Sequence, residues 1–302
     1  MFKHFFAGVA VALTANAATA AETIDILWAF NIGSNQANTV RYIIDEANSQ
    51  QNKYKFILIN KPGAGGTIAA NHVLQNPDNT LVAMSSSFFI RSVSNPKNSH
   101  DLDKFQTILV QATGAPLVLV SKKYQSLSEV MQQKNATIGV SGVGSISDMI
   151  ATQLKGSNLT LNVVQFKGMV DATVAAAGGH VDTAVTYAVD AQPFIDSGDL
   201  KILAYTGNND ISSHKNLTFE AQGIKGLDNL TANYAIFSAK ELSESKAKEL
   251  YSILSKANST MKVAESYDKD LLSPVKIDYD RSKDWYDSQR KYWQDLADKK
   301  IK

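Results

Sequence analysis

Apolar residues along this chain alternate between short, largely continuous runs and helically spaced positions. Runs at residues 24–29, 54–59 and 81–84 predict buried strands. Between the first two runs, regularly spaced apolar side chains predict the buried face of an amphipathic helix, formed by Val40, Ile43, Ile44 and Ala47. A second helix is expected from Thr67 until Asn76-Pro77 ends it. The first part of the chain therefore reads as βαβαβ.

The middle of the chain repeats this alternation of strands and helices. Strands are expected at residues 117–121, 137–140, 161–166, 183–185 and 201–205, and helices at residues 126–131, 148–154, 171–177 and 191–197. We expect the first of these strands to lead into a second domain, and a Ser-x-x-Glu capping box at Ser126 to start the first of these helices. A return strand at 233–238 and helices at 244–258 and 284–300 complete the chain, the last one packing through Trp285, Tyr286, Tyr292, Trp293 and Leu296.

The most distinctive stretch is Lys61-Pro62-Gly63-Ala64-Gly65-Gly66-Thr67, between a predicted strand and a predicted helix. Three glycines in four positions expose backbone N–H groups and permit positive φ angles. Thr67 is expected to cap the following helix, whose N-terminus would favour a bound carboxylate or phosphate. A tight strand-to-helix turn without a ligand explains the same residues equally well. The loop matches neither the nucleotide P-loop nor the dinucleotide fingerprint, because each requires a residue that is absent here.

Three loops follow the predicted parallel strands of the first part, at residues 30–35, 62–67 and 85–87. In open parallel sheets, ligands bind outside the carboxyl ends of the strands. These three loops are therefore expected to converge in space and to form a binding site, although they are far apart in sequence.

The N-terminal segment and the composition indicate where the protein works. Residues 1–20 combine a charged start, a short apolar stretch and an Ala18-Thr19-Ala20 cleavage pattern, which predicts a signal peptide and export with Ala21 as the first mature residue. The apolar stretch is shorter than the roughly 20 residues that cross a bilayer. A mature chain of about 280 residues suggests two domains. The absence of cysteine favours a bacterial periplasm for an exported protein of this size.

Charge and candidate catalytic residues argue against several classes of protein. The 30 basic residues nearly balance the 29 acidic ones, so nothing points to nucleic acid. The histidines are isolated, and no metal-ligand spacing, cofactor motif or catalytic constellation occurs. Gly142-Val143-Gly144-Ser145 does not match the elbow of serine hydrolases. Carboxylates such as Asp171, Asp182 and Asp190 are expected to be solvated or to cap helices. An exported hydrolase of carboxylate or phosphate esters is the less favoured alternative.

Four motifs together carry a resemblance to a known family. They are Asn60–Ile68 with Pro77-Asp78 downstream, Ser141-Gly142-Val143-Gly144-Ser145, Phe166-Lys167-Gly168, and Gly179-His180-Val181-Asp182 followed by Gly198–Ala204. In this order, over nearly the whole mature sequence, the chain resembles the extracytoplasmic solute receptors of tripartite tricarboxylate transporters, the Bug or TctC-like proteins. The first motif is quite specific for this family. The other three are weak one by one, and they support the resemblance because all four occur in the same order.

The resemblance implies an α/β fold of the two-lobed periplasmic binding protein type (Venus flytrap, type II-like), in which each lobe is a sheet covered by helices and a cleft lies between them. It implies lobe 1 at residues 21–118 and 231–302 and lobe 2 at residues 119–230. It further implies a monomeric periplasmic receptor, without metal or cofactor, that binds a small di- or tricarboxylate or related organic acid. The receptor would deliver this solute to the permease subunits of a tripartite membrane transporter. A receptor that signals to a sensor partner would use the same closure.

Carried over by position, the resemblance implies ligand-binding residues in both lobes. Lobe 1 would contribute Phe30, Asn31, Ile32, Gly33, Ser34, Ala64, Gly65, Gly66, Thr67, Ser85 and Ser86, and lobe 2 would contribute Gly142, Ser145, Phe166, Lys167, Gly168, Thr186 and Tyr187. The chain departs from the family pattern at Ala37, where Asp is usual, and at Thr186 and Tyr187, where Asp and Asn are frequent. Because an acid near the site would be the partner of an ammonium group, these departures favour a carboxylate without a free amine.

Overall fold

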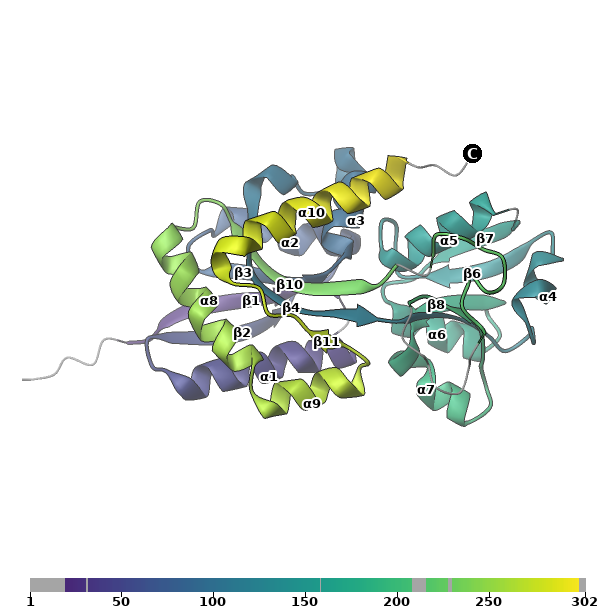
Figure 1. Ribbon diagram of the computed structural model, residues 1–302, viewed down its shortest axis with the longest axis horizontal. Coiled ribbons are helices and arrows are strands. Elements are labelled where there is room, and N and C mark those ends of the chain that lie inside the picture. The colour runs from purple at the N-terminus through teal and green to yellow at the C-terminus, as the bar shows by residue number, and fades with distance from the viewer. Residues whose placement is uncertain (1–19, 31, 158, 208–215, 228–229, 299–302) are drawn as a thin grey trace, which may run out of the picture.

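The structure is a computed structural model of the 302-residue chain, and it describes residues 20–30, 32–157, 159–207, 216–227 and 230–298. Two α/β lobes lie side by side along the long axis of the molecule, each built on its own β-sheet (Figure 1). The predicted signal peptide, except for Ala20, and the candidate residue Asn31 lie outside the described residues. Within the described part of the chain, no helix combines the length and the apolar character needed to cross a bilayer.

Lobe 1 is built on a six-stranded sheet with the strand order β11-β4-β10-β3-β1-β2. Its strands are β1 (Glu22–Trp28), β2 (Tyr54–Asn60), β3 (Thr80–Ser85), β4 (Phe105–Ala115), β10 (Ala232–Ala239) and β11 (Ser273–Pro274). β1 pairs in parallel with β2 and β3, whereas β10 runs antiparallel between β3 and β4. The βαβαβ prediction and the predicted return strand are therefore confirmed.

Helices cover both faces of this sheet. They are α1 (Asn35–Gln50), α2 (Thr67–Gln75), α3 (Ser87–Ser94), α8 (Glu244–Asn258), α9 (Met261–Lys269) and α10 (Tyr279–Asp298), with 3-10 turns at Ala64–Gly66, Pro96–Asn98 and Leu102–Lys104. Figure 1 shows α1, α8 and α9 gathered on one face and α2, α3 and α10 on the other. The apolar face predicted for α1 is buried against the sheet: Val40, Ile43, Ile44 and Ala47 are no more than 4% exposed.

Lobe 2 is built on a five-stranded sheet with the strand order β7-β6-β8-β5-β9. Its strands are β5 (Leu117–Ser121), β6 (Ala136–Val140), β7 (Leu161–Gln165), β8 (Thr183–Tyr187) and β9 (Lys201–Tyr205), and its helices are α4 (Leu127–Met131), α5 (Ile146–Gly156), α6 (Met169–Ala177) and α7 (Ala188–Asp196). β6 pairs in parallel with β7 and β8, and β5 pairs antiparallel with β8 and β9. The chain enters this lobe at Pro116, between β4 and β5, and returns between β9 and β10.

Helix starts show where local sequence signals hold and where they fail. The predicted capping box starts α4, because Ser126 Oγ accepts a hydrogen bond from Glu129 N at 3.3 Å. The prediction that Thr67 caps α2 is wrong: Gly66 occupies the cap position with a φ of 96°, and Thr67 is the first helical residue. Glycine adopts a left-handed conformation at little cost. Gly66, the third glycine of the loop, therefore takes the cap position in place of a residue with a capping side chain.

Four helices begin earlier than predicted. α5 begins at Ile146, α6 at Met169, α7 at Ala188 and α10 at Tyr279. Tyr292 also departs from the predicted apolar face of α10, since it is 38% exposed while Trp293 is fully buried. No sequence pattern described above predicts β4, α3 or α9. These elements depend on contacts between distant parts of lobe 1.

An aromatic cluster in lobe 1 fixes α3 directly behind the end of β3. Phe88 of α3 stacks on Phe237 of β10, with ring centroids 4.0 Å apart and an interplanar angle of 8°. His100 lies 4.4 Å from Phe88, centroid to centroid, and is 2% exposed. Because α3 follows Ser85 and Ser86 directly, this cluster also positions the carboxyl end of β3.

The burial of His100 predicts a pH-dependent loss of stability. Both ring nitrogens are buried without a well-formed hydrogen bond to a described residue, and burial lowers the pKa of His100 to about 4. Between about pH 6.5 and 4, the unfolded chain binds a proton that the folded chain excludes, so the free energy of unfolding should fall by about 3 kcal/mol through this window as the pH is lowered. Urea unfolding at a series of pH values measures the loss. His100→Phe should remove this part of the pH dependence, and identical profiles for both proteins would contradict the assignment.

Candidate functional site

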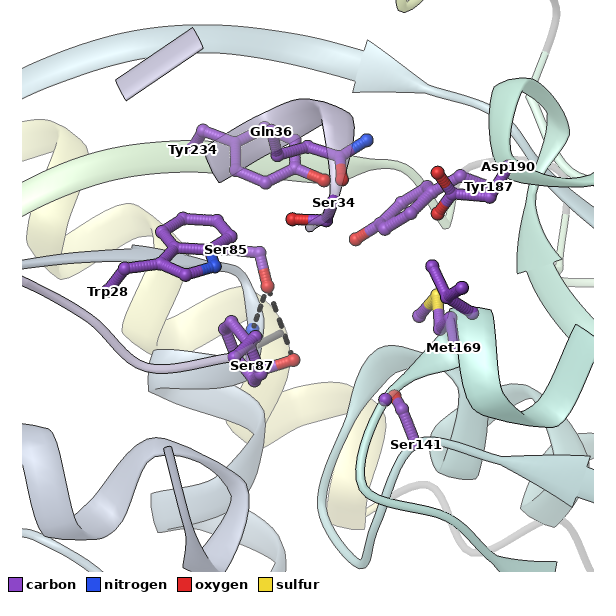
Figure 2. Close-up of a pocket in the computed structure, with 13 residues that line it drawn as sticks. Trp28, Ser34, Gln36, Ser85, Ser87, Ser141, Met169, Tyr187, Asp190 and Tyr234 are labelled. Atoms are coloured by element: carbon purple, nitrogen blue, oxygen red, sulfur yellow. Dashed lines mark hydrogen bonds between the residues drawn. The ribbon is translucent and has the colours of Figure 1, made fainter. Parts of the chain in front are cut away.

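A pocket lies between the two lobes, where β1, β3 and β8 end (Figure 2). Its cavity volume is about 50 Å³, enough for a few water-sized groups. The lining residues come from both lobes: Trp28, Phe30, Ser34, Gln36, Ser85, Ser87 and Tyr234 from lobe 1, and Ser141, Gly168, Met169, Val170, Tyr187 and Asp190 from lobe 2. The pocket therefore belongs to neither lobe alone.

Three buried serines form the polar wall of lobe 1. Ser34 caps α1, and its Oγ accepts a hydrogen bond from Ala37 N at 3.3 Å. Ser85 Oγ accepts from Ser87 N at 3.4 Å and donates to Ser87 Oγ at 3.3 Å. Serine is favoured where a helix begins, because its oxygen satisfies backbone N–H groups that have no partner within the helix. The same hydroxyls remain directed at the cavity in Figure 2.

The first turns of α6 and α7 form the wall of lobe 2. Gly168 is the N-cap residue of α6 and Tyr187 is that of α7, and neither makes a side-chain cap hydrogen bond. Asp190 lies in the first turn of α7. Figure 2 shows Tyr187 and Asp190 across the cavity from the serines of lobe 1.

Four helices therefore begin at this pocket: α1, α3, α6 and α7. The N-terminus of each presents backbone N–H groups without intrahelical partners, together with the positive end of the helix dipole. Such a terminus is a ready site for an anion. Among the described lining residues there is no lysine or arginine, so backbone, hydroxyl and amide donors are what the pocket offers to a carboxylate.

Asp190 is the only charged side chain among the described residues that line the pocket. Burial, assisted by the charge of Asp270 in lobe 1, raises the pKa of Asp190 to about 7. Burial also raises the pKa of Tyr187 to about 12, and it raises the pKa of Tyr234 well above the ordinary value. Both tyrosines therefore stay neutral near pH 7, whereas Asp190 is poised to gain or lose a proton.

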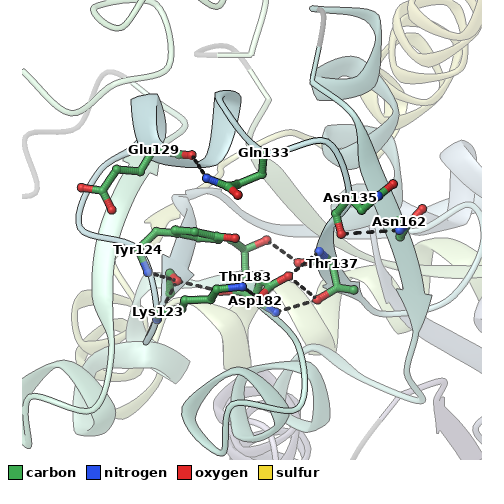
Figure 3. A network of polar contacts seen from close by, with 10 residues as sticks. Lys123, Tyr124, Glu129, Gln133, Asn135, Thr137, Asn162, Asp182 and Thr183 are labelled. Atoms are coloured by element: carbon green, nitrogen blue, oxygen red, sulfur yellow. Dashed lines mark hydrogen bonds and ion pairs between the residues drawn. The ribbon is translucent and has the colours of Figure 1, made fainter.

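Asp182, another carboxylate of lobe 2, has a different environment (Figure 3). It accepts hydrogen bonds from Lys123 Nζ at 2.7 Å and from Thr137 N at 2.9 Å. Although burial disfavours the charged form, these bonds hold the pKa of Asp182 below its ordinary value. The sequence led us to expect that Asp182 would be solvated or would cap a helix. The structure shows neither role. Asp182 ties β6 to the loop after β5.

A wider cleft of about 650 Å³ adjoins the pocket and shares Phe30 and Ser141 with it. Its remaining lining residues are Ala29, Pro62, Gly63, Ala64, Gly65, Arg91, Asn95, Asn98, Gly142, Val143, Phe166 and Lys167. The glycine loop thus faces this cleft, and the serines face the smaller pocket. The three loops predicted to converge do approach one another through Phe30, but they serve two adjoining cavities.

The glycines of the loop have separate structural roles. A Cβ atom on Gly66 would lie 2.1 Å from Met84 Cε, and one on Gly63 would lie 2.6 Å from Ile68 Cδ1. Gly65 has a φ of 61°, and a Cβ there would lie 3.2 Å from Val143 O in the other lobe. Tight turning and packing therefore account for Gly63 and Gly66, while Gly65 permits close approach of the lobes.

Arg91 joins the two lobes at the cleft. From α3 of lobe 1, its Nη1 donates a hydrogen bond to Val143 O of lobe 2 at 2.6 Å, and its Nη2 donates to Asn98 O at 3.3 Å. Gly144 makes room for this side chain, since a Cβ on Gly144 would lie 2.8 Å from Arg91 Cδ. The interlobe contact is therefore steric as well as polar.

The candidate residues are distributed over both cavities. Those that line the pocket are Phe30, Ser34, Ser85, Gly168 and Tyr187, and those that line the cleft are Phe30, Ala64, Gly65, Gly142, Phe166 and Lys167. Those that line neither are Ile32, Gly33, Gly66, Thr67, Ser86, Ser145 and Thr186. Two of these have structural partners: Ser86 Oγ accepts from Asn233 N at 2.9 Å, and Ser145 Oγ accepts from Asp148 N at 3.1 Å to cap α5.

The residues that sequence reasoning missed complete the pocket: Trp28, Gln36, Ser141, Met169, Val170, Asp190 and Tyr234. Ser87, which also lines it, belongs to the loop at residues 85–87 that was expected to converge on the site. The sequence could have indicated two of the missed residues as site residues, because Ser141 follows a predicted strand and Gln36 lies at the start of a predicted helix. Asp190 lacked such a signal, since the helix predicted at 191–197 began after it. Tyr234 lies within a strand, and only the meeting of the lobes brings it to the cavity.

The fold and the interlobe pocket define a two-lobed solute-binding protein, and solved structures share this fold. The periplasmic binding protein BugD has a TM-score of 0.82 and 18% identity, with 92% of this chain and 97% of that chain covered. MatC (Rpa3494) from Rhodopseudomonas palustris with bound malate has a TM-score of 0.78 and 21% identity, with coverage of 91% and 99%. R. palustris Rpa4515 with adipate has a TM-score of 0.80 and 17% identity, with coverage of 92% and 97%. No curated protein matches the chain in sequence.

The family model of the tripartite tricarboxylate transporter family receptor, TctC, matches residues 40–300. The chain belongs to this family of periplasmic solute receptors, which bind small carboxylates and work with tripartite transporters. The resemblance seen in the sequence and the two-lobed α/β fold are thereby confirmed. The protein is a receptor and not an enzyme, and no comparison supports the alternative of an exported hydrolase.

Proposed function

We propose that the interlobe pocket binds the carboxylate group of a small organic acid, a di- or tricarboxylate or a related acid, which the receptor delivers to the permease subunits of a tripartite transporter. The meeting of four helix N-termini, those of α1, α3, α6 and α7, at one pocket carries this proposal. Similar structures that hold malate and adipate, both dicarboxylic acids, support it.

The donors of the pocket suit a carboxylate. The hydroxyls of Ser34, Ser85 and Ser87 face the cavity, and the buried Gln36 Nε2 has no hydrogen-bond partner among the described residues. Hydrogen bonds from such groups to a carboxylate are charge-assisted, so a buried arginine is not required. Each helix N-terminus adds about 0.3–1 kcal/mol of favourable interaction, and up to about 2 kcal/mol where it is partly buried.

We further propose that the receptor acts as an exported monomer whose mature chain begins at Ala21, because two free lobes can close over a solute. We place the lobe boundaries near residues 118 and 231, close to Pro116 and to the segment between β9 and β10, where the chain passes from one sheet to the other. Candidate residues at the adjoining cleft, among them Gly65 and Lys167, would contact the far end of a larger acid. Closure would expel water and strengthen every polar contact in the pocket.

A thermal-shift screen of the mature chain tests the carboxylate proposal. The probes are di- and tricarboxylates, aromatic acids, amino acids, phosphate esters and uncharged sugars. An acid present at about 100 times its Kd should add roughly 2.7 kcal/mol of stability, which corresponds to an increase in Tm of roughly 5–10 °C for a chain of this size. Sugars should leave Tm unchanged. A flat response to every carboxylate, or a response to phosphate esters alone, would refute the proposal.

A further inference from the structure

Asp190 has no partner of its own in the pocket. Its carboxylate faces the cavity from the first turn of α7, opposite the serines of lobe 1 (Figure 2). Within the part of the chain that the structure describes, it accepts no hydrogen bond and forms no ion pair. Asp182 of the same lobe, by contrast, is held by Lys123 and Thr137. The two carboxylates therefore have different roles.

A role in starting α7 does not account for Asp190. A carboxylate in a first turn stabilises the helix by accepting bonds from its free N–H groups, and such bonds lower its pKa. The start of α7 has no side-chain cap hydrogen bond, and the pKa of Asp190 is raised to about 7 by burial and by Asp270. Desolvation thus outweighs any benefit from the helix N-terminus.

A buried acid of lobe 1, Asp270, acts on the half-buried Asp190 through its charge. Asp270 follows α9, is 5% exposed, and has an Oδ2 atom without a hydrogen-bond partner among the described residues. Its negative charge acts on Asp190 and on Tyr234. Burying carboxylates without a compensating positive charge is unfavourable. No described residue forms an ion pair with either acid, and no lysine or arginine lines the pocket itself, whereas Lys262 and Lys269 line a separate hollow together with Asp270.

The remaining walls of the pocket offer donors. Gln36 Nε2 is buried without a hydrogen-bond partner among the described residues, and the buried hydroxyl of Tyr234, beside Tyr187, also lines the cavity. The serines and the starts of α1 and α3 lie on the same lobe as these two groups. The cavity therefore has one end that suits an anion and another that suits a cation.

We propose that the pocket selects an amino carboxylate, whose carboxylate binds the serines and helix N-termini of lobe 1 and whose protonated amine binds Asp190. This inference rests on the proposed function and reverses the expectation, drawn from Ala37, of a solute without an amine. An ammonium group would form charge-assisted N–H···O bonds with Asp190. Asp270 would add negative potential at the same end of the solute.

Isothermal titration calorimetry with pairs of acids that differ by one amino group tests the inference. The pairs are succinate and aspartate, glutarate and glutamate, and butyrate and 4-aminobutyrate. In at least one pair, the amino acid should bind the mature chain about 10-fold more tightly or better. Asp190→Asn keeps the side-chain shape but removes its charge, and it should reduce this preference to less than about 2-fold. Asp196→Asn, which removes an exposed charge at the other end of α7, should retain the preference.

The possible outcomes separate this inference from the proposed function. Amine-free acids that bind as tightly as their amino partners, or more tightly, overturn the inference and leave the carboxylate receptor intact. A preference that persists in Asp190→Asn overturns the assignment to Asp190. Binding by neither kind of acid overturns both proposals. Because the acid pairs already discriminate in the unmodified chain, the test does not depend on the variant, and Asp190→Ser replaces Asp190→Asn if the latter does not fold.

Discussion

Replacing Phe88 by alanine is expected to lower the free energy of unfolding by about 3–5 kcal/mol. The ring is fully buried, and its centroid lies 4.0 Å from that of Phe237, 4.4 Å from that of His100 and 5.2 Å from that of Phe105. Removing it would leave a cavity that neighbouring aromatic rings cannot fill without strain. Because α3 begins at the pocket, ligand affinity should fall as well.

Urea unfolding measures this loss, and Tyr292→Ala is the matched control. Tyr292 is also an aromatic residue, but it is 38% exposed, so its truncation should cost less than about 1 kcal/mol. If both variants lost the same small amount of stability, the expected large cost of removing the Phe88 ring would be contradicted.

Replacing Gly144 by alanine is expected to weaken carboxylate binding by roughly 5- to 150-fold, because forced overpacking costs about 1–3 kcal/mol. The new Cβ atom would lie 2.8 Å from Arg91 Cδ and 3.0 Å from Arg91 Cα, across the contact between the lobes. The clash exists only while the lobes touch, so it opposes closure over a solute. Calorimetry with the best acid from the thermal-shift screen measures the change.

Gly179→Ala controls for backbone strain in this experiment. Gly179 and Gly144 share a φ of 75°, but a Cβ atom on Gly179 would meet nothing within 4 Å. Both variants therefore strain lobe 2 at a left-handed position, whereas only Gly144→Ala disturbs the lobe contact. An equal loss of affinity in the two variants would show that strain, and not the clash with Arg91, is responsible.

The fold could be predicted where burial leaves a regular apolar pattern. β3 and the helix α1 have such patterns, and so do most elements of lobe 2. β4 does not, because polar residues interrupt its run, and two of them, Thr107 and Gln111, are nevertheless 1% and 2% exposed. A local pattern of apolar residues cannot predict that polar side chains are buried when tertiary contacts bury them. The same holds for α3, whose buried Arg91 reaches the other lobe.

The pocket could be predicted only in part, because it is assembled from the starts of helices in two lobes. Loops after predicted strands pointed to Ser34 and Ser85, which line it. Asp190 could not be found in this way, since its importance depends on burial and on the proximity of Asp270, both of which arise when the lobes meet. The absence of an acid at Ala37 therefore says little about the charge of the finished site.

The hydrogen bond from Arg91 to Val143 lies beside the pocket and not within it. It favours touching lobes whether or not a solute is present, and a bond from a charged donor contributes about 1.5–3 kcal/mol. In a transport cycle, copies that close while empty would occupy the permease as dead-end competitors of loaded copies. A stronger contact would retain a bound solute better, but it would also increase the share of closed empty copies and so slow the delivery of solute.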